Sequence, residues 1–65
     1  MDYAEAVRAA IVATVGEAVA DDMQWHDAAF EKTVAYLQGT DYSIEDLKAE
    51  PSFAYTVYDI LAFSL

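Results

Sequence analysis

Asp22 and His26 have the spacing of two metal ligands on one face of a helix. Residues four apart lie on the same helical side, and carboxylate and imidazole groups both bind metal ions. The pair is half a site at best, because the chain has one His and no Cys. Acid–base catalysis would also need a second group in a cleft, which 65 residues rarely enclose. We therefore expect no metal, no cofactor and no enzymatic activity, with His26 an ordinary surface residue near a helix start.

Negative charge is concentrated around this pair. The stretch from Gly16 to Glu31 contains five carboxylates, the single Trp and no Lys or Arg. Two pairs of these acids are spaced four apart, which destabilises a helix by about 0.2–0.5 kcal/mol per pair. Such a cluster is either a solvated face with helix caps or a binding face for a basic partner. The candidate partner-binding residues are Glu17, Asp21, Asp22, Trp25, Asp27 and Glu31.

The aromatic residues allow a structural and a binding interpretation. Trp25 either packs over the core, with its indole N–H donating to a carboxylate, or is a partly exposed anchor surrounded by charge. Tyr42, Tyr55 and Tyr58 are expected in the core or at its rim. The sequence leaves both interpretations of Trp25 open.

Composition limits the class of partner. Three basic residues against twelve acidic ones give a net charge of −9, which repels nucleic acid and anionic membranes. The natural partners are basic surfaces, above all those of proteins that bind nucleic acids. The longest apolar runs, residues 9–15 and 60–63, fall far short of the roughly 20 residues of a membrane span. The lack of Cys excludes disulfides and is compatible with a reducing cytoplasm, where we expect the protein.

The acids could also imitate DNA. Carboxylates four apart on a helix are separated by about 6 Å along its axis, whereas duplex DNA places a charge every ~1.7 Å. One helix therefore has too low a charge density. Mimicry would need the acids of the 17–31 stretch to join a second group: Asp41, Glu45, Asp46 and Glu50.

The elements that must position these residues are predicted to be helices. Apolar residues recur at helical spacing over 3–20, from Tyr3 to Val19, and Asp2 with Glu5 fits a capping pattern. Gly16 within this helix would allow a bend or the close approach of another backbone.

A second helix is expected over 23–38. Asp21 and Asp22 offer its N-cap, Trp25 lies in its first turn, and Gly39 supplies a left-handed stop. In this arrangement the helix dipole stabilises the negative charges of Asp21, Asp22 and Asp27 at the start of the second helix. It does not stabilise Glu17, which is expected at the end of the first helix.

The C-terminal part is divided by Pro51. Ser43 and Asp46 form a capping pattern for a short helix over 44–50, and a last helix starts at Pro51 or Ser52. This last helix is apolar on nearly every face, as in a helix enclosed by others. It is either the centre of a monomeric bundle or leaves Tyr58, Phe63 or Leu65 exposed for a partner or a second copy.

Together these elements predict an all-α fold: a single domain over 1–65, a compact bundle of three to four short helices with the last helix at its centre.

A short, acidic, all-helical, cysteine-free chain resembles the small inhibitors that bacteriophages encode, above all anti-CRISPR proteins. The resemblance lies in the general character of the whole chain and in no motif. It implies a non-enzymatic inhibitor, in the cytoplasm of a host bacterium, whose acids and Trp25 occupy the nucleic-acid-binding surface of a CRISPR effector. Two alternatives remain: an acidic immunity or antitoxin protein, and a structural module that forms a homodimer through its last helix and the face of its first, with the acids serving solubility.

Overall fold

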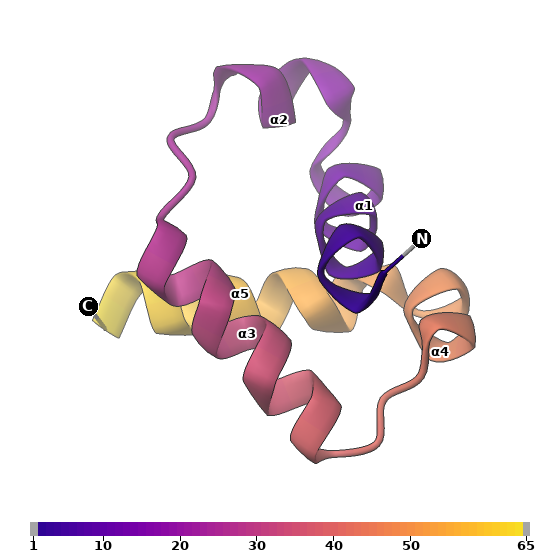
Figure 1. Cartoon of the computed structure of the whole chain (residues 1–65). Helices are drawn as coiled ribbons and strands as arrows, with labels where there is room; N and C mark the ends of the chain where they lie inside the picture. Colours follow the sequence, from indigo (N-terminus) through magenta and orange to yellow (C-terminus); the bar gives the residue numbers. More distant parts are fainter. Residues whose placement is uncertain (1, 65) are drawn as a thin grey trace.

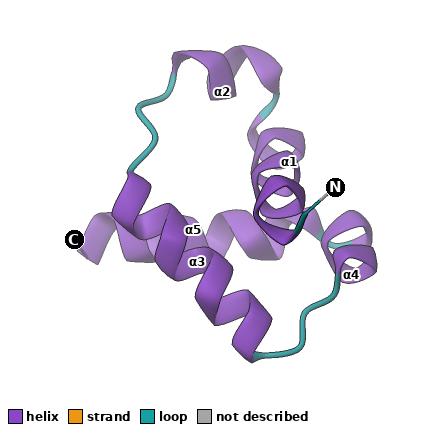
Figure 2. Cartoon of the chain, in the orientation of Figure 1, coloured by secondary structure: helices purple, strands orange, loops and turns teal. Residues whose placement is uncertain are grey.

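The computed structural model describes residues 2–64, and all regular structure within them is helical. The all-α prediction is thereby confirmed. Figure 2 shows the helices joined by loops, of which the two four-residue links, 23–26 and 40–43, flank the third helix. The helices are α1 (Tyr3–Val15), α2 (Glu17–Asp22), α3 (Asp27–Gly39), α4 (Ile44–Ala49) and α5 (Pro51–Ser64).

The region predicted as one helix over 3–20 is helical on both sides of Gly16 but is not continuous, because the chain breaks at Gly16, where a bend was one of the two expectations. Gly16 has φ 93° and ψ 149°, a conformation that is essentially restricted to glycine. Its N–H still bonds to the Val12 carbonyl at 2.7 Å, and the chain then starts α2 in a new direction. A Cβ at Gly16 would meet nothing within 4 Å, so the residue serves the backbone turn and not a close approach of another segment.

The start and end of α3 also differ from the prediction. Its N-cap is His26, whose Nδ1 accepts from the Ala29 N–H at 3.3 Å, so Asp21 and Asp22 do not cap it. Trp25 lies in the link before the helix and not in its first turn. Gly39 is the last residue of α3, and the left-handed conformation falls on Asp41, with φ 58°. Asp adopts this conformation more readily than most residues, since its short side chain can hydrogen-bond locally.

The predicted N-caps of α1 and α4 are confirmed. Asp2 accepts from the Glu5 N–H at 2.8 Å at the start of α1. Ser43 and Asp46 form a reciprocal capping box: Ser43 Oγ accepts from the Asp46 N–H at 3.1 Å, and the Asp46 carboxylate accepts from the Ser43 N–H at 3.0 Å. Pro51 opens α5.

Packing is organised around α5. Figure 1 shows α1 and α3 crossing in front of α5, and both contact it, as does α4 at one end. α2 contacts only α1 among the described helices. The radius of gyration, 10.7 Å, equals the value of about 11 Å expected for a compact chain of this length. The buried apolar residues of the central cluster are Ala6, Val7, Ala10, Ile11, Ala29, Leu37, Leu47, Ala54 and Tyr58.

α5 is central in its contacts but is not enclosed. Only Ala54 and Tyr58 of this helix are buried, whereas Ile60 is 60% exposed and Phe63 is 94% exposed. Phe63 is exposed, as one of the two alternatives for this helix expected, whereas Tyr58, at 4% exposed, lies in the core as the aromatic pattern predicted. Leu65 lies outside the described residues.

Candidate functional site

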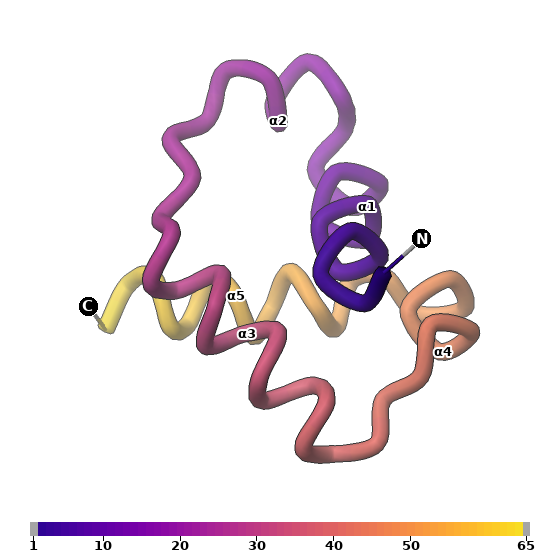
Figure 3. Tube along the Cα trace, in the orientation of Figure 1, coloured from indigo at the N-terminus to yellow at the C-terminus, as the bar shows by residue number. Residues whose placement is uncertain are grey.

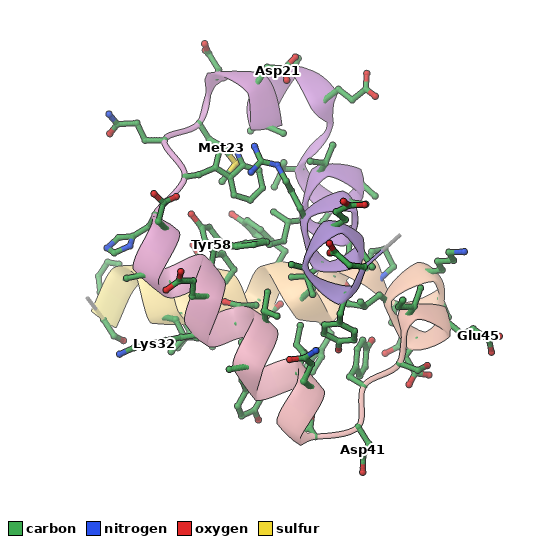
Figure 4. The ribbon with its side chains drawn as sticks, in the orientation of Figure 1. Asp21, Met23, Lys32, Asp41, Glu45 and Tyr58 are labelled. Atoms are coloured by element: carbon green, nitrogen blue, oxygen red, sulfur yellow. The ribbon has the colours of Figure 1, made fainter. Side chains whose placement is uncertain are left out.

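The five carboxylates predicted to bind a partner are all exposed. Three lie on α2 and two on the first turns of α3, and we call this region, residues 17–31, the acidic corner. Figure 4 shows Asp21 at the outer tip of the molecule. α2 and α3 do not contact each other, so the corner consists of two acidic groups joined by the link 23–26.

The break at Gly16 reverses the expected electrostatics of α2. Glu17 lies in the first turn of α2, where the helix dipole stabilises negative charge. Asp21 and Asp22 lie in its last turn, which contains no basic residue and where the dipole disfavours carboxylates. Asp27 is in the first turn of α3, as expected. The two aspartates at the tip therefore lack local compensation, which a cation from outside could provide.

Trp25 connects the acidic corner to the core. Its ring packs edge-on against Phe30, with ring centroids 6.1 Å apart, and against Tyr58 at 5.7 Å. Its Nε1–H donates to the Ala20 carbonyl at 3.3 Å, and not to a carboxylate as the structural interpretation expected. The indole is half-buried. This packing holds the link 23–26 and the end of α2 on the body of the protein, while a role of Trp25 in binding stays a prediction.

Arg8 lies over the same indole. Its guanidinium carbon is 4.4 Å from the centre of the Trp25 ring, on the side that α1 supplies. Such a contact stabilises by about 0.5–1 kcal/mol at exposed sites. The guanidinium is thus directed at the ring face, and sequence reasoning had no signal for this contact, since 17 positions separate the two residues in the chain.

Tyr58 fixes the link from the other side. The His26 backbone N–H donates to the Tyr58 hydroxyl at 2.7 Å, so the residue that caps α3 is also bonded to α5. Because Tyr58 is buried and also touches Trp25, it joins two consecutive residues of the link to the core. The acidic corner is therefore presented by a fixed backbone.

Val19 is the apolar residue that the acidic corner exposes most. It was predicted on the buried stripe of the first helix, which is wrong: it is 56% exposed, because α2 turns away after Gly16. Val19 lines a shallow depression with Ala18, Asp22 and Met23. The corner thus offers a small apolar contact beside two carboxylates.

The second acidic group does not extend this surface. Figure 4 shows Asp41 and Glu45 on other sides of the molecule from Asp21, and α4 makes no contact with α2. Asp46 is engaged in the capping box of α4. The described residues therefore do not assemble the continuous line of charge that imitation of a duplex would require.

Two tyrosines near this second group have raised pKa values. The Tyr3 hydroxyl donates to the Tyr42 carbonyl, and the Tyr42 hydroxyl donates to the Glu50 carbonyl at 2.9 Å. Burial raises the pKa of Tyr3, and Asp46 adds to the shift. Burial also raises the pKa of Tyr42, with Glu50 contributing next. The two hydroxyls, which donate as neutral phenols, tie α1, the 40–43 link and the end of α4 together.

An apolar groove of about 280 Å³ lies between α1 and the start of α4 and α5. Alanine side chains of α1 form one wall, and Ile44, Leu47 and Pro51 form the other. Lys48 is the charged residue at its edge, and no acid of the corner lines it. The groove is therefore a small, mostly apolar surface.

Residues 2–64 contain no group of three His, Cys, Asp or Glu side chains placed to hold a metal ion. None of the helices described is both long and apolar enough to span a membrane.

Comparison with known proteins adds no identification. No family model, curated protein or solved structure matches this chain. The functional argument therefore rests on the geometry of the acidic corner.

Proposed function

We propose that this protein is a non-enzymatic inhibitor, of the anti-CRISPR type, whose acidic corner binds a basic, nucleic-acid-binding surface of another protein. Binding there excludes nucleic acid, because both ligands need the same Lys and Arg side chains. The observation that carries the proposal is the exposure of five carboxylates over residues 17–31, with no Lys or Arg among them.

The local charge environment supports a cationic partner. Asp21 and Asp22 lie at the C-terminal end of α2, where the helix dipole disfavours negative charge. Arg8, the one basic residue of α1, is directed at the Trp25 ring. A guanidinium or ammonium group of a partner would supply the missing compensation and form charge-assisted hydrogen bonds. Val19 adds apolar contact beside these carboxylates.

Rigidity of the corner supports the same proposal. The contacts of Trp25 and the bond from His26 to Tyr58 fix the link between the two acidic groups before a partner arrives. A preformed surface loses less conformational entropy on binding than a flexible acidic tail. Electrostatic attraction of this kind acts mainly on the association rate and weakens with salt.

Affinity capture from a bacterial lysate at low and high salt tests this proposal. We expect capture of a nucleic-acid-binding protein at low salt, loss of capture at high salt, and displacement of the captured protein by added nucleic acid. A CRISPR effector among the captured proteins would support the anti-CRISPR form, and a nuclease toxin would point to the immunity-protein alternative.

A matched pair of variants makes the test specific for the corner. The substitutions Asp21→Lys, Asp22→Lys and Asp27→Lys should abolish capture while the helical circular dichroism is retained, since all three side chains are exposed. The control reverses three exposed acids elsewhere, with Asp41→Lys, Glu45→Lys and Glu50→Lys, and should keep most of the binding. Unchanged capture by the folded corner variant would contradict the proposal.

A further inference from the structure

The outer face of α5 carries a stripe of residues that its own chain leaves partly uncovered. Phe53 is 38% exposed, with its ring also packed on Tyr42 at 5.1 Å between centroids, while Ile60 is 60% and Phe63 94% exposed and Thr56 lies exposed between them. Figure 3 shows α1 and α3 passing in front of the α5 trace, and both contact α5. The α5 stripe, residues 53, 56, 60 and 63, extends for about 15 Å along the helix axis.

The spacing along the α5 stripe is symmetric. Its steps are three, four and three residues, the alternation of a coiled-coil seam. Reversing the direction of the helix leaves this pattern unchanged. A second α5 in antiparallel orientation would therefore place Phe53 opposite Phe63 and Thr56 opposite Ile60, on both sides of a two-fold axis. A pattern of this kind fits the self-complementary contact that a symmetric dimer requires.

Charge also selects a second copy as the occupant. The chain has a net charge of −9, yet Asp59 is the only charged residue of α5. A contact between two α5 helices therefore brings together one carboxylate from each molecule, far fewer than a contact between two acidic corners. A basic partner, in contrast, would find one carboxylate on α5 and several on the acidic corner.

The polar side chains of this face are already satisfied. The Thr56 hydroxyl donates to the Ser52 carbonyl at 3.0 Å, and the Ser64 hydroxyl donates to the Ile60 carbonyl at 2.9 Å. Covering the stripe therefore buries no unpaired hydroxyl, which is the usual cost of placing Thr or Ser in an apolar contact.

We propose that the protein forms a two-fold homodimer through antiparallel pairing of the α5 stripes. The three apolar side chains expose roughly 350 Å², with an aromatic side chain contributing up to about 200 Å². Stable dimers bury about 800 Å² per subunit, so this contact gives a weak dimer that depends on concentration. The proposal is independent of the acidic corner, which stays exposed in the dimer.

Sedimentation equilibrium of the whole chain from about 10 µM to 1 mM tests this pairing. We expect a monomer–dimer equilibrium that salt strengthens, because screening reduces the repulsion between two acidic molecules. Ile60→Glu combined with Phe63→Glu should weaken association by about 100-fold or more, since each buried charge must be desolvated. A wild-type chain that stays monomeric at the highest concentration and in high salt would overturn the proposal.

Two further variants distinguish specific pairing through the α5 stripe from non-specific hydrophobic association. Tyr36 on α3 is 52% exposed, so Tyr36→Glu removes a comparable exposed hydrophobe elsewhere and should leave the dimer unchanged. Asp59→Asn removes the like charges that meet along one edge of the antiparallel pair and should strengthen dimerisation by about two- to five-fold. Equal loss of association in the Tyr36 variant, or weaker association of the Asp59 variant, would contradict pairing through α5.

Disulfide trapping tests the antiparallel register directly, because the chain has no Cys of its own. A mixture of Thr56→Cys and Ile60→Cys chains should form mainly the mixed disulfide under mild oxidation. Parallel pairing would instead favour the two homodisulfides, and that result would overturn the proposed arrangement.

Discussion

The acidic corner and α5 are opposites in charge and in packing. α2 carries three carboxylates in six residues and contacts one helix, whereas α5 carries one carboxylate in fourteen residues and contacts three. The most exposed side chains also differ in kind: five carboxylates beside Val19 in the corner, and the large apolar side chains of Ile60 and Phe63 on α5. The comparison teaches that charge and apolar surface are segregated on this small molecule.

Segregation gives the two surfaces opposite responses to salt. Binding of a basic partner to the corner weakens as ionic strength rises, because exposed opposite charges are screened. Pairing of two α5 stripes strengthens under the same conditions, because the repulsion between two acidic molecules is screened. A single salt titration can therefore assign an observed association to one region or the other.

The largest change in stability is expected for Trp25, the residue that joins the acidic corner to the core. Trp25→Ala removes the packing on Phe30 and Tyr58 and the contact with Arg8, and should cost about 3 kcal/mol of unfolding free energy. A chain of 65 residues has a total of roughly 3–10 kcal/mol, so much of its stability depends on this side chain. Denaturant unfolding followed by circular dichroism measures the loss. Val19→Ala, on the exposed side of the same corner, should change stability by less than about 0.5 kcal/mol, and equal losses would show that the indole does not anchor the corner.

The two glycines should respond in opposite directions. Gly16→Ala forces a side chain into a conformation that disfavours it and should cost about 1–3 kcal/mol. Gly39→Ala sits at the end of α3 with free space around the new methyl group and should stabilise by about 0.5 kcal/mol. Thermal unfolding of both variants checks this. If Gly16→Ala were also stabilising, α1 and α2 would form the continuous helix that the sequence predicted.

Alkaline pH should destabilise the protein through Tyr3 and Tyr42, two tyrosines outside the acidic corner. The pKa values of Tyr3 and Tyr42 are raised above the ordinary 10.0 in the folded protein, so the folded state retains protons that the unfolded state loses. The stability from these two groups is complete below pH 10.0 and falls as the pH rises above it toward the folded pKa values. Thermal midpoints measured across this range should decline less steeply for Tyr3→Phe, and an identical decline in both proteins would argue against this origin.

The smallest effect is expected within α2. Asp22→Asn removes a negative charge from the C-terminal end of the helix and should stabilise it by about 0.3 kcal/mol. Glu17→Gln removes a charge that the first turn favours but also relieves the repulsion with Asp21 four residues later, so its net effect should be smaller than that of Asp22→Asn. Unfolding curves at low salt compare the two variants, and a larger stabilisation by Glu17→Gln would contradict this orientation of α2.

Local patterns predicted local structure well. The capping residues Asp2, Ser43 and Asp46 and the start of α5 at Pro51 follow from residues within one turn of each other, and all are as expected. Tyr58 at the core and Tyr42 at its rim were predicted correctly because large aromatic side chains gain most from burial, whether they lie on a helix or in a loop. The exposed carboxylates of the corner were likewise evident from their charge.

Other features depend on contacts that no local pattern encodes. Glycine fits both a continuous helix and a break, so the sequence could not decide between them at Gly16. The local pattern predicts Trp25 on a helix, but the structure has it in a link. Its position depends on its contact with Tyr58, 33 positions later, which no local pattern encodes. The sequence left two alternatives for the last helix, enclosed at the centre of the bundle or exposed along one face. Which one occurs depends on the helices that pack against it, and the sequence does not specify them.

Chemical-shift mapping of the isotopically labelled protein with its strongest captured partner tests the central claim most directly. Amide signals of residues 17–31 should shift on binding in low salt, while those of the α5 stripe stay unchanged. Shifts confined to residues 53–63, with the acidic corner unaffected, would contradict the assignment of partner binding to this corner.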